Sequence, residues 1–250
     1  MSIVLKDVHK AFGPKEVLRG FSLEVREGET FSIVGGSGSG KSVALKHIVR
    51  LLEPDRGEVW VDGDNVGALS EEALYALRRE VGYVFQFAAL FDSMTVDENV
   101  GMGLRRIPGM GADEIGRRVA ECLRLVDLAG YESRYPSELS GGQKKRAGLA
   151  RAIATRPKYL LYDEPTTGLD PVTTAVIDGL IVRMRRELGV TGVVITHDMA
   201  SAFRISDRVA MLHEGRIRFE GTPGEMKATQ DPVVKGFIEG RPDLLLEVAS

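Results

Sequence analysis

Cysteine is nearly absent from this 250-residue sequence, which contains a single one, Cys122. One cysteine excludes a disulfide scaffold and a thiolate metal site. Cys122 lies among apolar residues with helical spacing, so we expect its side chain to pack inward as a small hydrophobe. Residues 1–10 also lack the basic flank and the apolar stretch of a signal peptide. Together these absences predict a protein of the cytoplasm.

Long apolar runs and an excess of one charge are missing as well. No stretch approaches the roughly 18 uninterrupted apolar residues that a membrane span needs, and the best run, residues 81–90, carries Gln86. The 33 basic and 36 acidic residues give a net charge of −3 and are mixed along the chain, so we expect no nucleic-acid partner. With 43% apolar residues, the chain can still bury an ordinary globular core.

The first part of the chain predicts mainly strands. Apolar and polar residues alternate in three segments, which predicts antiparallel strands at residues 3–8, 21–26 and 58–62. Residues 31–34 predict a short buried strand that runs into glycines, and a helix is predicted over residues 41–52. Strand, glycine loop and helix form one structural unit.

The rest of the chain predicts a helical region followed by alternating strands and helices. Residues 95–154 have a helical pattern. Apolar strands at 159–162 and 192–195 then flank a helix that Asp170 caps and Pro171 opens. The expected core face of this helix consists of Val172, Val176, Leu180 and Met184. Strands that alternate with helices form an α/β fold with a parallel sheet, and the working loops lie at the strand ends.

A glycine-rich loop follows the predicted strand at residues 31–34. It contains Gly35, Gly36, Ser37, Gly38, Ser39, Gly40, Lys41 and Ser42. Glycines let consecutive backbone N–H groups face phosphates, and the N-terminus of the next helix adds a favourable dipole. Lys41 would reach the β and γ phosphates of a nucleotide, and Ser42 would ligate Mg²⁺. A flexible glycine-serine turn is the alternative, but the strand-to-helix context favours the phosphate site.

Two adjacent acids end the predicted strand at residues 159–162. Asp163 can hold Mg²⁺, and Glu164 can orient an attacking water as a general base. The alternative is a pair of solvated acids at a strand end. Pro165 and the glycine-rich loop upstream favour the catalytic interpretation.

The segment Leu-Ser-Gly-Gly-Gln at residues 139–143 opens a predicted helix. It resembles the signature sequence of ABC ATPases. The resemblance implies that Ser140, Gly141, Gly142 and Gln143 contact the γ phosphate held by a second copy of the chain. The protein would then work as a homodimer that encloses two ATP molecules with Mg²⁺.

Other elements of the same family occur in the expected order: Phe12, Gln86, Asp170 and His197. The resemblance implies that Phe12 stacks on adenine, that Gln86 senses Mg²⁺ and the attacking water, and that His197 hydrogen-bonds the γ phosphate. Asp170 would organise the dimer contact. Taken singly, these residues could also be a core phenylalanine, a surface strand end, a loop histidine and a helix cap. Val43 replaces a hydroxyl residue that often follows Ser42, so slightly weaker phosphate contacts are expected.

The resemblance implies a P-loop NTPase (RecA-like) core with an N-terminal antiparallel β-subdomain and an inserted α-helical signature subdomain. Residues 1–221 would form one ABC ATPase domain, in which residues 1–90 and 156–221 are the core and about 91–155 the helical subdomain. Residues 222–250 would be a C-terminal tail that packs on its own domain, stabilises the dimer or binds a regulator. A leucine cluster at residues 244–246 suggests some burial of this tail.

Residues 87–96 carry apolar side chains that could accept a helix of a membrane permease, although core packing is an alternative. With residues 89–100 and the Phe-Ile-Glu-Gly stretch at 237–240, they resemble the ATPases of MCE-type (Mla-like) systems, which move phospholipids between bacterial membranes. The implied partners are a permease dimer and an MCE-domain protein, and the implied place is the cytoplasmic face of the inner membrane. Importers of amino acids or other small solutes are the alternative, and a soluble ATPase of iron–sulfur assembly is a third.

One basic cluster has a simpler interpretation. The residues concerned are Lys144, Lys145, Arg146 and Arg151. They are expected to form a solvated helix face rather than a functional site.

Overall fold

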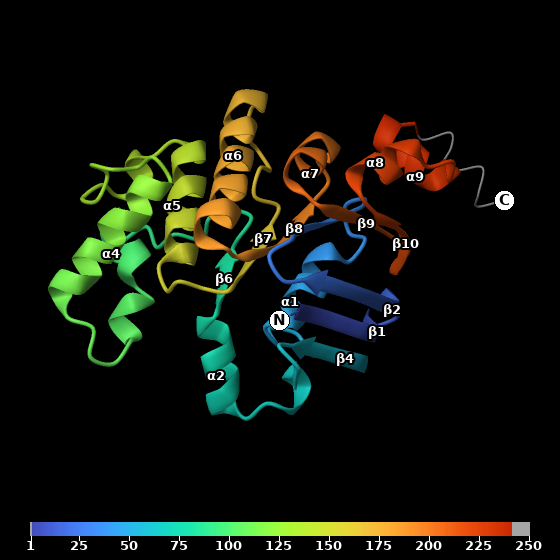
Figure 1. Ribbon diagram of the computed structural model, residues 1–250, viewed down its shortest axis with the longest axis horizontal. Helices are drawn as coiled ribbons and strands as arrows, with labels where there is room; N and C mark the ends of the chain where they lie inside the picture. Colours follow the sequence, from blue (N-terminus) through green and yellow to red (C-terminus); the bar gives the residue numbers. More distant parts are fainter. Residues whose placement is uncertain (1, 242–250) are drawn as a thin grey trace. The chain divides into compact units, whose positions relative to one another are not determined.

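The structure, a computed structural model, describes residues 2–241 (Figure 1). The chain divides into two compact units. Unit 1 combines the chain up to Tyr75 with the chain from Val193 on, and unit 2 is Ala76–Gly192. The predicted helical subdomain, residues 91–155, falls within unit 2, and its boundaries stay a prediction. The leucine cluster at residues 244–246 lies outside the described residues.

Unit 1 contains a four-stranded antiparallel sheet with the order β2-β1-β4-β5. The strands are β1 (Ser2–Phe12), β2 (Lys15–Arg26), β4 (Arg56–Val61) and β5 (Asp64–Asn65). Ile3 and Leu5 are buried, and Leu5 pairs with both Leu23 and Val59. Side chains that alternate across a strand thus give this sheet a buried face. β1 and β2 extend further than predicted because a tight turn at Gly13, with φ of 58°, joins them.

Unit 1 also contains strands in the order β10-β9-β3-β8. They are β3 (Thr30–Val34), β9 (Arg208–His213), β10 (Arg216–Gly221) and β8 (Thr191–Thr196), which belongs to unit 1 from Val193 on. β3 pairs with β9 in parallel, and β9 pairs with β10 antiparallel. Every residue of β3 is buried, as is usual for a parallel strand covered on both faces.

The helices of unit 1 are α1 (Lys41–Ile48), α7 (Met199–Ile205), α8 (Pro223–Ala228) and α9 (Pro232–Glu239), and η1 (Val66–Ala68) is a 3₁₀ turn. Met226 of α8 and Val233 and Val234 of α9 lie in one buried cluster with Val34 and Met211. The described part of the predicted tail therefore packs on its own unit.

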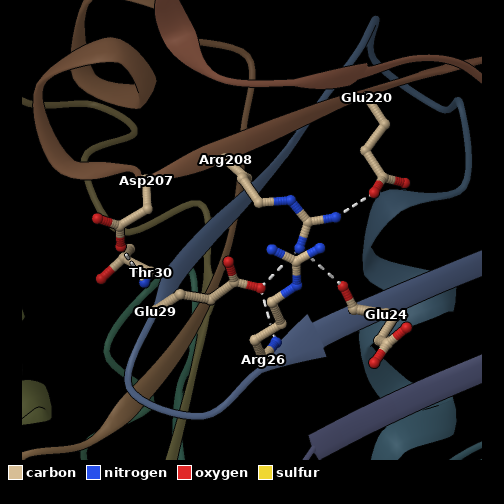
Figure 2. A network of polar contacts seen from close by, with 7 residues as sticks. All are labelled: Glu24, Arg26, Glu29, Thr30, Asp207, Arg208 and Glu220. Atoms are coloured by element: carbon tan, nitrogen blue, oxygen red, sulfur yellow. Dashed lines mark hydrogen bonds and ion pairs between the residues drawn. The ribbon is translucent and has the colours of Figure 1, made fainter.

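A network of ion pairs fixes the entry to β3 (Figure 2). Arg208, the first residue of β9, donates to the Glu29 carboxylate at 2.9 Å and also pairs with Glu220. Next to it, the Thr30 amide donates to Asp207 at 2.8 Å. Arg208 and Glu29 are largely buried, so removal of Arg208 would leave the Glu29 carboxylate without this cation, which is costly for a buried charge. The network ties the start of β3 to β9 and so supports the strand that leads into the glycine loop.

Unit 2 combines a pair of parallel strands with helices. Its elements are β6 (Val81–Val84), β7 (Tyr159–Asp163), α3 (Val96–Gly101), α4 (Ala112–Leu125), α5 (Gly141–Ile153), α6 (Pro171–Leu188) and the 3₁₀ turns η2 (Leu104–Arg106) and η3 (Pro136–Glu138). α2 (Glu71–Arg79) runs from unit 1 into unit 2. α5 packs against α3, α4, α6 and β6, and Figure 1 shows α4 and α5 side by side.

Cys122 of α4 is fully buried, which confirms its predicted inward packing. Burial raises the pKa of its thiol to about 11, so the thiolate that would react is scarce at neutral pH. Among residues 2–241, no helix is both long enough and apolar enough to cross a bilayer.

The helix predicted over residues 41–52 is shorter than expected. α1 ends at Ile48, and Arg50 adopts a left-handed backbone conformation with φ of 48°. The Arg50 side chain donates to the carbonyl oxygens of Leu69 at 2.8 Å and Val66 at 3.3 Å. These contacts fix the chain just after α1. They join residues far apart in the sequence, so helical periodicity alone does not reveal them.

The predicted core face of α6 is wrong in its first turns. Leu180 and Met184 are buried as expected, but Val172 and Val176 are exposed. Ile177 and Ile181 complete the buried face instead. Residues three and four apart share a helix face, so the face that packs is set by the later turns of α6.

Candidate functional site

The glycine loop joins β3 to α1 in unit 1. Gly35 must be glycine, because a Cβ atom there would lie 2.3 Å from the Leu212 carbonyl oxygen. Gly40 precedes α1 with a φ of 108° and provides no side-chain cap. A helix that starts without a cap leaves its first N–H groups open to an anion. The backbone here is arranged as a phosphate site requires.

Lys41 is buried and folds back over the loop. Its ammonium group donates to the carbonyl oxygens of Gly35 at 2.8 Å and Gly36 at 3.0 Å. The Oγ atom of Ser39 is buried and has no hydrogen-bond partner within the described residues. Since buried hydroxyl groups are rarely left unsatisfied, this atom marks a place for a ligand. The ammonium, the hydroxyl and the uncapped helix start together fit a nucleotide phosphate.

The remaining predicted nucleotide residues of unit 1 are at or near the surface. Exposed loop residues are Gly36, Ser37 and Gly38, and half-buried residues of α1 are Ser42 and Val43. Phe12 is the last residue of β1 and is 47% exposed, so it is not a core residue. Its ring is accessible for stacking on a nucleotide base. His197 is exposed directly after β8, where Asp198 caps α7.

Asp163 ends β7 in unit 2, and Glu164 follows it. Their exposed fractions are 7% and 9%, so they are not the solvated pair of the alternative interpretation. Tyr83 of β6 donates its hydroxyl to Asp163 at 3.1 Å, and Thr167 donates to Glu164 at 2.9 Å. Burial and the neighbouring Asp163 carboxylate raise the pKa of Tyr83, so its hydroxyl stays protonated and can donate. Two buried, hydrogen-bonded acids at a strand end suit metal binding and base catalysis.

Glu164 also has an unusual backbone conformation. Its φ of 50° lies in the left-handed region, which costs a non-glycine residue of order 1 kcal/mol or more. Such strain persists only where the surroundings fix it, and it is common at functional sites.

Gln86 is half-buried after β6, and its backbone carbonyl accepts a hydrogen bond from the Lys145 ammonium of α5. Ala88 and Ala89, which follow it, have positive φ values of 61° and 48°. Arg151 of α5 donates to the carbonyl oxygens of both alanines at 2.6 Å. Two cations of one helix therefore hold the segment after Gln86.

The predicted solvated basic face of α5 is wrong for two of its members. Lys145 is only 6% exposed and also donates to the Glu164 carbonyl at 3.3 Å. Arg151 is half-buried, and burial lowers the pKa of its guanidinium. Both side chains satisfy backbone carbonyls of distant segments, which helical spacing does not show. Lys144 and Arg146 are half-buried.

The predicted signature residues begin α5. Ser140 caps the helix, because its Oγ accepts the Gln143 amide at 3.3 Å, and the Gln143 side chain accepts the Ser140 amide at 2.8 Å. A hydroxyl that accepts one hydrogen bond keeps its own proton for another acceptor. Gly141 is exposed, and a Cβ atom at Gly142 would lie 2.6 Å from the Thr173 methyl group.

Asp170 caps α6 as predicted. Its carboxylate accepts the amides of Val172 at 2.9 Å and Thr173 at 3.0 Å, and also the Thr173 hydroxyl. The hydrogen bonds from Thr173 lower the pKa of the Asp170 carboxyl. Capping accounts for this residue within one chain, and its dimer contact stays a prediction.

The strand, glycine loop, internal lysine and uncapped helix define a phosphate-loop nucleotide-binding protein. A sequence model described as ABC transporter matches residues 18–167. The chain belongs to the ABC transporter family. It is an ABC transporter ATPase subunit that binds ATP with Mg²⁺ and hydrolyses it, and its fold is the α/β P-loop NTPase fold of ABC cassettes.

Similar proteins support this assignment. Protein TRIGALACTOSYLDIACYLGLYCEROL 3, chloroplastic, from Arabidopsis thaliana is 42% identical over 96% of this chain and 74% of its own length. The methionine import ATP-binding protein MetN of Thermobifida fusca is 48% identical over 89% of this chain and 72% of its own length.

Solved structures lead to the same family. The ATP-binding cassette MJ0796, a dimer in a post-hydrolysis state with ADP and Pi, has a TM-score of 0.81 and 36% identity over 88% of this chain and 98% of its own. The cbiO1 protein from Clostridium perfringens, part of the ABC transporter complex cbiONQ, has a TM-score of 0.83 and 30% identity over 98% of both chains.

Proposed function

We propose that this chain energises a membrane importer of an amino acid or another small solute. The observation that carries the proposal is the match to methionine import ATP-binding proteins, which reaches 48% identity. The chain would bind a dimer of permease subunits at the cytoplasmic face of the inner membrane. ATP binding and hydrolysis would then drive the permease between two conformations.

The residues that bind nucleotide follow the sequence resemblance. Residues 35–43 cradle the phosphates, where Lys41 neutralises charge and Phe12 stacks on the adenine. Ser42, Gln86 and Asp163 are the residues that would hold Mg²⁺, which offsets phosphate charge when it is bound. The buried Oγ of Ser39, which has no hydrogen-bond partner in the part of the chain that the structure describes, supports this assignment.

The residues that act on water and the γ phosphate are Glu164 and His197. Glu164 orients the attacking water and accepts its proton, and His197 hydrogen-bonds the γ phosphate. The near burial of Glu164, at 9% exposure, supports a role as base, since burial keeps competing water away from it.

A second copy of the chain completes each site. Ser140, Gly141 and Gly142 at the start of α5 face the γ phosphate bound to the other copy, and Asp170 organises the contact. The MJ0796 cassette was solved as a dimer, which supports this arrangement. ATP favours the closed dimer and phosphate release favours the open one, so hydrolysis shifts a two-state equilibrium.

The segment after Gln86 offers the permease an apolar surface. Phe87 is 80% exposed and Phe91 is 51% exposed, so neither packs fully into the core of this chain. Ala88 between them is buried against α5. Exposed aromatic side chains on a fastened backbone suit an apolar partner helix.

Glu164→Gln tests the catalytic part of the proposal. We expect kcat to fall about 1,000-fold, because the amide cannot accept a proton from water, while ATP binding persists and closed dimer accumulates. Single-turnover hydrolysis and size-exclusion chromatography with Mg-ATP measure the two effects. Glu187→Gln, which removes the same charge from the exposed end of α6, is the control. A normal rate in Glu164→Gln would show that another group is the base.

The cargo is tested by isolating the chain from detergent-solubilised native membranes and identifying bound proteins and lipids by mass spectrometry. A permease together with a solute-binding protein would support the importer. Recovery of soluble assembly proteins alone would instead favour the iron–sulfur alternative and would remove the membrane part of the proposal.

Lipid transport between bacterial membranes is the second candidate. The observation that favours it is the Arabidopsis relative, which is named after a glycolipid and aligns over 96% of this chain. The stretch at residues 237–240, by contrast, gives little support, because Phe237 and Ile238 pack against the core of unit 1. In the same isolation, an MCE-domain protein and phospholipid bound with the permease would establish lipid transport and overturn solute import.

A further inference from the structure

Lys145 occupies an unusual position for a lysine. It lies in the second turn of α5, two residues after the signature segment, and is only 6% exposed. Its ammonium donates to two backbone carbonyls, those of Gln86 and Glu164, the latter at 3.3 Å. These two residues come from different segments of unit 2 and are both assigned to hydrolysis.

The energetics of burial require such contacts. A buried ammonium loses its hydration, and this loss is costly unless hydrogen bonds and nearby charges replace it. The two carbonyl oxygens that Lys145 contacts, those of Gln86 and Glu164, provide such hydrogen bonds.

The backbone of Glu164, one of the two residues that Lys145 contacts, has a strained conformation that needs support from its surroundings. Glu164 has the strained φ of 50°, and the carbonyl that Lys145 contacts is its own. The Thr167 amide at 3.3 Å and the Thr167 hydroxyl at 2.9 Å are further donors to Glu164. A strained conformation persists only while its surroundings fix it, so loss of the ammonium should let the Glu164 side chain move.

We propose that Lys145 is a positioning residue for ATP hydrolysis, whose ammonium fixes the backbone of Gln86 and Glu164 together and so sets the geometry of both side chains. The inference rests on the proposed roles of Gln86 and Glu164. Lys145 would act without touching the nucleotide, through its hydrogen bonds to the backbone carbonyls of Gln86 and Glu164.

Arg151, which lies further along α5 than Lys145, makes similar contacts with backbone carbonyls. It fastens the carbonyls of Ala88 and Ala89, directly after Gln86 and Phe87. Gly148 lies between the two cations on the helix, and a Cβ atom there would come within 3.2 Å of the Ala88 methyl carbon. Close approach of the helix at Gly148 lets both cations reach the segment.

The test compares Lys145→Met with Arg118→Met. Arg118 is a matched control because it is 7% exposed and donates to two carbonyls at the other end of α5, those of Ile153 at 2.6 Å and Ala154 at 2.9 Å. For each variant, kcat and KM for Mg-ATP, the affinity for a non-hydrolysable ATP analogue and the Tm are measured on the full chain. A merely structural role would change Tm without separating kcat from KM.

We expect Lys145→Met to lower kcat about 100-fold, as misplacement of a reacting group by about 1 Å does. KM and analogue affinity should stay within about twofold, because the lost interaction concerns the transition state. Arg118→Met should lower Tm and leave kcat near the wild-type value. Lys145→Arg, which keeps the charge and several donors, should exceed Lys145→Met in kcat at least about tenfold.

Three results would overturn the inference. They are a wild-type kcat in Lys145→Met, an equal loss of kcat in Lys145→Met and Arg118→Met, and equal kcat values for Lys145→Met and Lys145→Arg. Glu164→Gln in the same assay separates this inference from the proposed function. A wild-type kcat in Lys145→Met beside an inactive Glu164→Gln would overturn only the positioning role, whereas an active Glu164→Gln would overturn the assignment of the base.

Discussion

The helices α1 and α5 are the two whose first turns we propose to bind phosphate, and these two starts are built in different ways. α1 follows Gly40, which has no side chain and makes no cap. α5 follows Ser140, whose hydroxyl takes part in a reciprocal capping box with Gln143. At α1 no side-chain cap provides a partner for the first N–H groups, whereas the capping box of α5 already provides partners for two backbone N–H groups, those of Ser140 and Gln143.

This difference suits two kinds of contact with phosphate, if both helix starts bind phosphate as we propose. The site at α1 includes the buried Lys41 and the Ser39 hydroxyl, which has no hydrogen-bond partner among residues 2–241. At the start of α5, Gly141 is exposed, and the capping box provides partners for the amides of Ser140 and Gln143 before any phosphate binds. A lasting nucleotide site and a transient one, formed only on dimer closure, would require this contrast.

Among substitutions at the helix starts, the largest effect on ATP binding is expected for Lys41→Ala. Loss of a hydrogen bond from a charged donor costs about 1.5–3 kcal/mol, so ATP affinity should fall at least about 10-fold and up to about 100-fold. Lys46→Ala, which removes the same charge from the last turn of α1, should leave affinity unchanged. Equilibrium binding of a fluorescent ATP analogue measures both variants. If Lys41→Ala and Lys46→Ala bound ATP equally well, Lys41 would have only a structural role, and the contrast between α1 and α5 would not hold.

A smaller effect is expected at Ser140. Here substitutions can remove the proposed phosphate contact of the hydroxyl while keeping the helix cap. Asp caps a helix as well as Ser but accepts hydrogen bonds only and would repel a phosphate. Ser140→Asp should therefore keep the Tm, while the rate of ATP hydrolysis falls about 30-fold for the loss of roughly 2 kcal/mol of contact with a charged group. ATP affinity of the single chain should not change.

Ser140→Ala is the complementary variant, since it loses the cap as well as the hydroxyl. Its Tm should fall by the equivalent of about 1 kcal/mol. Ser140→Arg should block dimer closure altogether, which size-exclusion chromatography with ATP detects. Normal hydrolysis by Ser140→Asp would mean that the start of α5 meets no phosphate.

The sequence predicted the features that depend on local chemistry. Gly35 to Ser42 can be identified because a phosphate loop needs glycine and lysine at fixed spacing, and the Asp170 cap because it precedes Pro171. The role of Lys145 could not be predicted, because its carbonyl partner Gln86 lies 59 positions earlier in the chain. A lysine in a basic cluster has the same local pattern whether it is solvated or buried. The end of α1 was missed for a similar reason, since Arg50 turns through contacts with residues 66 and 69.

The smallest effect is expected at the third helix start, where Asp170 caps α6 with a charged side chain. The hydrogen bonds from Thr173 lower the pKa of Asp170 from its ordinary value of 3.8. A lowered pKa contributes stability that is present above the ordinary value and is lost as the pH falls through the lowered one. Asn caps as well as Asp but does not titrate, so Asp170→Asn should be slightly less stable than the wild type at about pH 7, and the difference should shrink as the pH falls below about 3.8. Thermal unfolding across this range measures the difference, and a gap in Tm that is constant with pH would contradict it. If Asp170→Asn also loses ATP-dependent dimer while its Tm stays close to the wild-type value, then the carboxylate acts between copies as well as within α6.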